Sequence, residues 1–225
     1  MRARRKLCAW ICLLWVIGSF AAHADDSWQM ALSRMPLGTN VTELNATNYA
    51  KIMLGAFQSN RAVKALVFLP GAIDEFYWNR QTKAELTNGW PSLLDAVSAL
   101  TNQTRIQALF RPPMLLLRTD SDPVEPQGVI KDAPTARRIM QQRFVAHALY
   151  NDRDWDSLRP ALRKTCGADF WPGMYSRYSF HFYRHSFAAW NLTGWEALEA
   201  VSLAGKTAFT VEEDRVIFEE DHRGF

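Results

Sequence analysis

The chain has 225 residues, with 26 Lys and Arg against 23 Asp and Glu, and 12% of its residues are aromatic. Its aromatic and apolar content is that of a packed globular protein and excludes a disordered chain. The near balance of charge argues against nucleic acid as a partner, because phosphate binding requires a clustered basic surface.

Residues 1–24 have the three parts of a secretory signal peptide. Four basic residues stand within the first six positions, an uncharged apolar run extends from Leu7 to Phe20, and Ala22-His23-Ala24 supplies small residues at the cleavage site. The apolar run is shorter than the roughly 18–20 residues that a membrane-spanning helix needs. We therefore expect cleavage after Ala24, a periplasmic or secreted mature protein, and no transmembrane segment once the signal is removed.

Removal of the signal changes both the charge and the cysteine content. The mature chain keeps 22 of the 26 basic residues, because four lie in the signal, and all 23 acidic ones, so its formal charge is about −1. Cys166 becomes the only cysteine in the sequence, which excludes an internal disulfide. An exported protein of this kind depends on its hydrophobic core for stability.

Apolar spacing and turn residues predict an α+β chain. In the first part, we expect helices over 45–58 and 91–100, a partly helical stretch over 74–86, and strands over 62–69, 104–110 and 114–118. Pro70-Gly71 is interpreted as a turn and residues 120–134 as a loop. In the second part, we expect helices over 135–150, 155–164 and 193–204, a loop over 167–173, and strands over 178–187, 206–211 and 215–219.

The same order of elements, strand-helix-strand-strand, is expected twice. The two helical segments are also similar in sequence: Leu94-Asp95-Ala96-Val97-Ser98 matches Leu198-Glu199-Ala200-Val201-Ser202, and each segment follows a Gly-Trp pair. We predict an internal repeat. The expected fold is two strand-helix-strand-strand half-units with additional helices between them. Residues 25–134 would form the first half-unit with an N-terminal helix, and residues 135–225 the helical connection and the second half-unit.

The C-terminal stretch carries a family resemblance. It runs from Asn191 through Gly194-Trp195-Glu196-Ala197-Leu198 to Val201, followed by 205–211 and 215–218. Asn191 or Thr193 can cap the helix, and Gly205 lets the chain reverse. This pattern resembles the short N-terminal domain of secretins and TonB-dependent receptors, over about 178–219 and more loosely over 63–119. The resemblance implies a periplasmic interaction module that docks against other envelope proteins by strand edges or helix faces.

Motifs for catalysis are absent from the sequence: there is no Gly-x-Ser-x-Gly, phosphate-binding loop or dinucleotide fingerprint. We predict no catalytic residue, no cofactor and no metal site. His181, Tyr183 and His185 share a face of an expected strand and could join His147 or His222 at a metal, but their spacing matches no established motif. Asp120-Ser121-Asp122 is interpreted as a solvated turn and Cys166 as a buried thiol.

Five aromatic residues form the candidate ligand groove for a sugar or peptide, with burial in the core as the competing interpretation. These residues are Phe76, Tyr77, Trp78, Trp171 and Tyr175, and Tyr178 stands close to them in sequence. The favoured function is a non-catalytic envelope or periplasmic interaction module with an envelope protein as partner. The alternative is a small-molecule-binding protein or enzyme whose site lies between the two half-units and uses the aromatic cluster and the acidic Asp120 loop.

Overall fold

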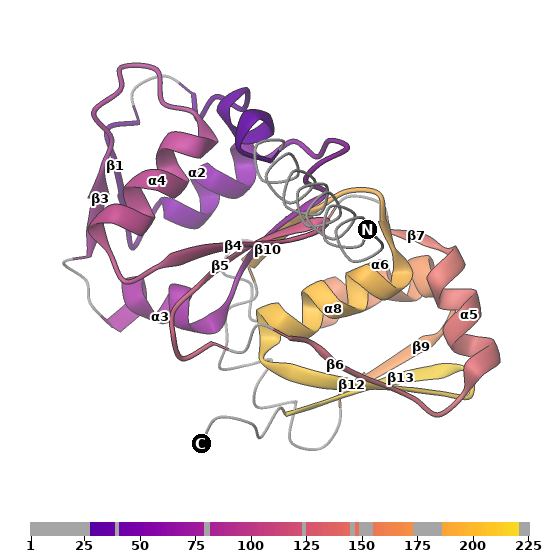
Figure 1. Cartoon of the computed structure of the whole chain (residues 1–225). Helices are drawn as coiled ribbons and strands as arrows, with labels where there is room; N and C mark the ends of the chain where they lie inside the picture. Colours follow the sequence, from indigo (N-terminus) through magenta and orange to yellow (C-terminus); the bar gives the residue numbers. More distant parts are fainter. Residues whose placement is uncertain are drawn as a thin grey trace, which may run out of the picture.

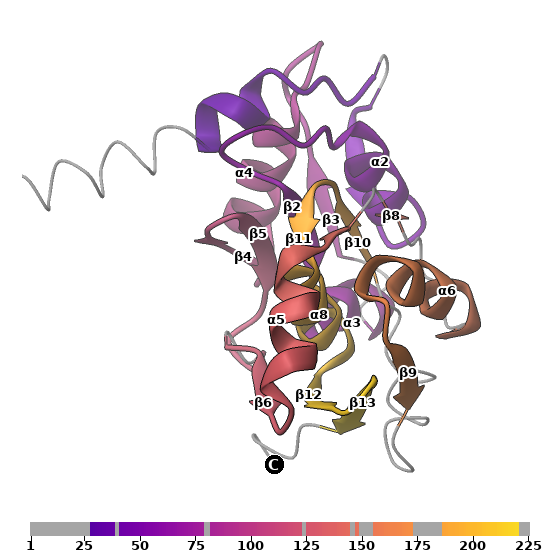
Figure 2. The same cartoon turned by 90° about the vertical axis from the view of Figure 1, so that its right-hand side faces the viewer.

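The computed structural model describes residues 28–38, 41–78, 82–122, 125–144, 147–148, 155–172 and 186–220. The fold belongs to the predicted α+β class, with helices packed on both faces of a central sheet and a second sheet beyond them (Figures 1 and 2). Within these ranges, every helix is too short or too polar to cross a membrane.

The central sheet has five strands in the order β4-β5-β2-β10-β8. Its strands are β2 (Ala65–Phe68), β4 (Gln107–Arg111), β5 (Met114–Arg118), β8 (His147–Ala148) and β10 (Ser186–Ala189). β2 runs parallel to β5, and the other neighbours are antiparallel. All residues of β2 and β10 are buried, which explains why β2 reads as a continuous apolar run and not as an alternating one.

Three helices and a small two-stranded sheet lie on one side of the central sheet. They are α2 (Tyr49–Ala56), α3 (Pro70–Trp78), α4 (Leu93–Gln103), β1 (Glu43–Asn45) and β3 (Lys83–Glu85). Their apolar side chains form one core with Phe68 and Leu117 of the sheet. Pro70-Gly71 begins α3 and is not the expected turn, because proline is tolerated in the first turn of a helix, where its missing N–H costs nothing.

A second core fills the space between the central sheet and a four-stranded sheet. The second sheet has the order β6-β12-β13-β9, with β6 (Gln127–Ile130), β9 (Asp169–Pro172), β12 (Thr207–Glu212) and β13 (Arg215–Glu220). Between the sheets lie α5 (Ala133–Gln141), α6 (Trp155–Cys166) and α8 (Gly194–Gly205), beside the short pair β7 (Arg143–Phe144) and β11 (Leu192–Thr193).

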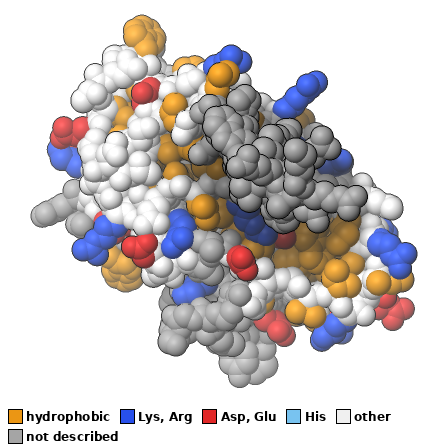
Figure 3. Space-filling model, viewed as in Figure 1, with side chains coloured by type: hydrophobic (Ala, Val, Ile, Leu, Met, Phe, Trp, Pro, Cys, Tyr) orange, Lys and Arg blue, Asp and Glu red, His pale blue; other side chains and the backbone are white. Residues whose placement is uncertain are grey.

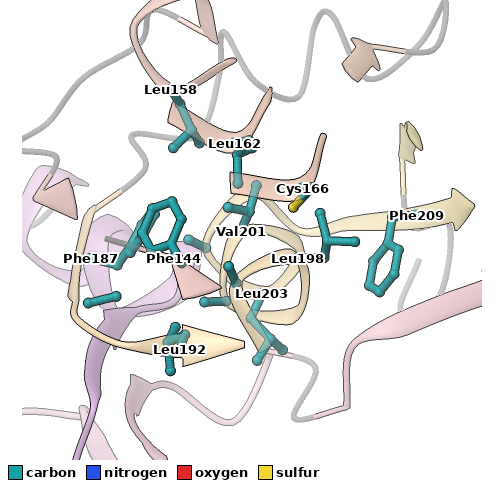
Figure 4. Close-up of a cluster of buried hydrophobic side chains, with 14 of the residues drawn as sticks. Phe144, Leu158, Leu162, Cys166, Phe187, Leu192, Leu198, Val201, Leu203 and Phe209 are labelled. Atoms are coloured by element: carbon teal, nitrogen blue, oxygen red, sulfur yellow. The ribbon is translucent and has the colours of Figure 1, made fainter. Parts of the chain in front are cut away.

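Helix α8 is the centre of this second core. Nine of its 12 residues are buried, because it packs on both sheets. Figure 4 shows Leu198, Val201 and Leu203 of α8 surrounded by side chains of the neighbouring elements, among them Leu162 and Cys166 of α6. A helix covered on several sides has apolar residues around most of its circumference, as α8 does.

The helix and hairpin of the two expected half-units correspond residue for residue. Ser92 and Thr193 cap α4 and α8, and both caps are capping boxes in which the third helical residue is acidic. Arg111 and Met114 flank the β4–β5 turn as Glu212 and Arg215 flank the β12–β13 turn, and each corresponding pair is 101 residues apart. In both units, an earlier strand runs parallel to the second hairpin strand, β2 beside β5 and β9 beside β13.

The strand that begins the second unit is therefore β9, which lies in the segment expected to be a loop. The strand expected over 178–187 overlaps β10, which pairs with β2 in the central sheet and not with its own hairpin. Residues 178–185 lie outside the described residues. β6 is the reverse case: it lies within residues 25–134 of the expected first half-unit, but it pairs with β12 in the sheet of the second unit. Pairing across the chain halves is a tertiary property that local sequence patterns do not contain.

The sequence match between residues 94–98 and 198–202 aligns the two helices with an offset of 104 residues, three more than the offset of 101 between their capping residues. The caps align Ala96 with Ala197 and Val97 with Leu198, all four of which are buried. A shift of three residues leaves a helix on nearly the same face, so its apolar pattern still matches. After α8 it is Lys206, and not Gly205, that takes the left-handed conformation, with φ of 50°.

Two further elements differ from expectation. The helix expected over 135–150 ends at Gln141, after which Arg143 and Phe144 form β7. The loop expected over 120–134 contains β6, whose residues are mostly exposed and which lacks the alternation of a half-buried strand. β6 is a strand because its backbone pairs with β12.

Candidate functional site

A groove of about 820 Å³ opens where β5 ends and β4 begins. One wall is a single face of α3, with Gly71, Asp74, Glu75 and Trp78 at helical spacing. The opposite wall is the end of α4 and the start of β4, and the remainder is the turn that follows β5. The residues outside α3 that line the groove are Thr101, Thr104, Arg105, Ile106, Gln107, Thr119, Asp120 and Ser121.

A buried carboxylate fixes the geometry of this groove. Asp122 is 8% exposed, and its oxygens accept hydrogen bonds from the backbone N–H groups of Gly71 at 2.7 Å and Thr119 at 2.8 Å. A negative charge near the start of α3 complements the free N–H groups and the positive end of the helix dipole. A Cβ at Gly71 would lie 2.5 Å from Asp122 Oδ2 and would overlap Thr119 Oγ1, so only glycine allows this close approach.

The lining of the groove is acidic. Asp74, Glu75 and Asp120 carry negative charge against the single positive charge of Arg105. Burial raises the pKa of Asp74 above its ordinary value, and the negative charge of Asp122 adds to this rise; a hydrogen bond with Trp78 and the charge of Lys206 oppose it. Such a surface attracts cationic groups, which would also relieve the repulsion between the carboxylates.

The predicted aromatic groove does not form as one site among the described residues. Trp78 is 77% exposed and lines the acidic groove, with Tyr77 edge-on to it at 4.9 Å between ring centroids. Phe76 points to the other side of α3, where it is 1% exposed and stacks on Tyr49 at 4.2 Å. Trp171 stands on β9 in the other sheet beneath the guanidinium of Arg159. Tyr175 and Tyr178 lie outside the described residues.

The residues considered for metal binding or nucleophilic chemistry are not brought together in a metal site or a reactive site among the described residues. Asp120 accepts a hydrogen bond from Gln107 at 2.6 Å, and Asp122 is held by backbone N–H groups. The backbone of His147 lies in β8, while His181, Tyr183, His185 and His222 lie outside the described ranges. Across the described ranges, no three His, Cys, Asp or Glu side chains are placed to share a metal ion. Cys166 is fully buried, and burial raises its pKa to about 12, so it stays a neutral thiol.

The outer edge of β4 is the second feature of the site. β4 is an edge strand of the five-stranded sheet, and within the described part of the chain no strand pairs with its outer side. Gln107 and Leu109 are exposed along it, and Gln107 also lines the groove. The corresponding strand of the second unit, β12, is covered on that side by β6. This edge is not predicted from the sequence, because an edge strand is distinguished from a central strand by its neighbours in the sheet.

The charged side chains on the visible face of the molecule are interspersed. Figure 3 shows Lys and Arg side chains among Asp and Glu on that face, without one extended basic patch. Comparison with protein-family models, with curated proteins and with solved structures finds no match to the chain.

Proposed function

We propose that the mature chain is an exported, non-catalytic interaction module of the cell envelope that binds an extended segment of a partner protein at the outer edge of β4. The observation that carries the proposal is the contrast between the two units: β12 has a parallel neighbour, whereas no strand among the described residues lies beside the outer edge of β4. An unpaired edge offers a row of N–H and C=O groups to another chain, and strand addition is a common mode of peptide recognition.

Export and the envelope location rest on the signal-like residues 1–24. The resemblance to the N-terminal domains of secretins and TonB-dependent receptors supports the same proposal and remains a prediction. Sequencing the N-terminus of the protein recovered from its own cells tests the location, with Asp25 as the expected first residue.

Photo-crosslinking in the native cell tests the binding edge. A photoreactive amino acid at Leu109, which is 36% exposed on β4, should capture one partner protein in a defined adduct. The matched control is the same amino acid at Met140, which is 40% exposed on α5. Equal adduct patterns at the two positions would show that the β4 edge is not a binding site.

The acidic groove favours a second candidate, a protein that binds a small organic cation. A cation could contact the exposed indole of Trp78 and the carboxylate of Asp74, since aromatic faces and carboxylates both attract cations. Calorimetric titration with arginine amide and spermidine tests this candidate. Saturable binding that disappears in Asp74→Asn would favour it over strand addition, and the absence of heat would remove it.

A further inference from the structure

The backbone groups that β4 presents at its outer edge can be identified. Leu69 donates its N–H to the carbonyl of Leu117 at 2.8 Å, so the backbone N–H and C=O groups of Leu117 point toward β2. Those of its neighbour Leu116 therefore point toward β4. Leu116 pairs with Leu109, so Leu109 uses its backbone groups inside the sheet. The residues whose N–H and C=O groups point outward are therefore the two that flank it, Ala108 and Phe110.

The second unit supplies the direction and register of a strand at this edge. β6 runs parallel to β12, with Gly128 opposite Phe209 and Ile130 opposite Val211. The offset of 101 residues makes Ala108 and Phe110 the counterparts of Phe209 and Val211. A partner strand in the same register would place two alternate residues opposite Ala108 and Phe110, and both would face the side of the sheet that α4 covers.

The partner residue opposite Ala108 has more room than Gly128 has in the second unit. A Cβ at Gly128 would lie 2.5 Å from the ring of Phe209, which explains the glycine there. Ala108 has only a methyl group in the corresponding place. The strand that fits β4 can therefore carry apolar side chains at both alternate positions, beside Ala108 and Phe110, which already pack against the apolar core beneath them.

A parallel strand would begin at the acidic groove. Its N-terminal end would lie beside Gln107, which lines the groove and donates a hydrogen bond to Asp120. Because side chains alternate along a strand, the residue two positions before the first apolar one points to the same side, where α3 and the end of α4 form the groove walls. Three carboxylates against Arg105 make a cationic side chain the complementary one there.

We propose that the partner segment runs parallel to β4 and carries Lys or Arg two residues before the first of two alternating apolar residues. This inference rests on the proposed function and specifies the chemistry of the partner. The β4 edge supplies backbone hydrogen bonds, the two apolar residues lie against the α4 side of the sheet, and the groove sets the direction of the chain.

Selection from a random twelve-residue peptide library tests the inference on the mature chain, residues 25–225. Ala108→Pro serves as the counter-selection, because proline removes one outward N–H while the bonds from β4 to β5 remain. Ala108→Ser keeps that N–H and a small side chain, and is the matched control. Peptides retained by the wild type and by Ala108→Ser but not by Ala108→Pro should share the pattern of a basic residue followed by two alternating apolar residues.

A charge exchange in the best peptide supplies a measurement that does not depend on the folding of Ala108→Pro. Replacing its Lys or Arg by Glu should weaken binding to the wild-type chain by about tenfold, from lost attraction and added repulsion. With Glu75→Gln, which removes a carboxylate of the α3 wall, the same exchange should have a smaller effect. An equal affinity for both peptides, or an equal effect of the exchange in both chains, would overturn the inference.

The two proposals fail in different ways. Peptides that require the N–H of residue 108 but have no basic residue in that position would overturn the inference and leave edge binding intact. Peptides that bind Ala108→Pro as well as the wild type would overturn the inference too, and equal crosslinking at Leu109 and Met140 would then overturn the proposed function as well.

Discussion

Replacement of Asp122 by alanine removes the carboxylate that joins the turn after β5 to the start of α3. Hydrogen bonds to a charged group contribute about 1.5–3 kcal/mol each, and Asp122 accepts two from backbone N–H groups, at 2.7 and 2.8 Å. Because Asp122 is 8% exposed, water replaces these bonds poorly. We expect Asp122→Ala to lower the free energy of unfolding by about 3 kcal/mol.

Urea unfolding of the mature chain, followed by tryptophan fluorescence, measures this loss. Asp120→Ala is the matched control, since it removes the same type of residue from the same turn, where the side chain is exposed. Surface substitutions of this kind change stability by about 0.5 kcal/mol or less. A loss in Asp122→Ala no larger than that in Asp120→Ala would refute the structural role of the carboxylate, and with it the account of why Gly71 is required.

Three further predictions concern other parts of the fold. The folded chain holds the Asp74 proton to higher pH than the unfolded chain, so the contribution of Asp74 to stability falls as pH rises from the ordinary carboxyl range through its raised pKa. Thermal unfolding should therefore show Asp74→Asn more stable than the wild type at pH 7 and not at pH 3. An equal gain at both pH values would contradict this. Thr193→Ala should cost about 1 kcal/mol by removing the cap of α8, whereas Thr193→Ser keeps the hydroxyl and should cost less than half as much in the same urea assay. Cys166 is fully buried with a pKa near 12, so a thiol reagent at pH 8 should modify it no faster than the chain unfolds, and rapid modification of the folded protein would show that the thiol is accessible.

The local patterns of the sequence predicted most elements of the fold. The strand expected over 114–118 is β5 with the same limits, and the helix expected over 193–204 is α8 displaced by one residue. The capping residue Thr193 was identifiable because a hydroxyl followed three residues later by Glu satisfies two free N–H groups through neighbours in sequence. Such signals depend on residues a few positions apart, and so they can be read from the chain alone.

The candidate site depended on contacts between distant segments. Trp78 and Asp120 were identified from the sequence, but only the packing of α3 against the turn after β5 brings them to one groove. The same packing of α3 buries Phe76 in the core. The β4 edge was invisible for the same reason, since an edge is defined by the strand that is missing beside it. By itself, the sequence determined the α+β class and the repeated helix and hairpin. The tertiary structure decided which strands pair, because β6 and β10 find their partners about 80 and 120 residues away and local periodicity carries no record of such pairing.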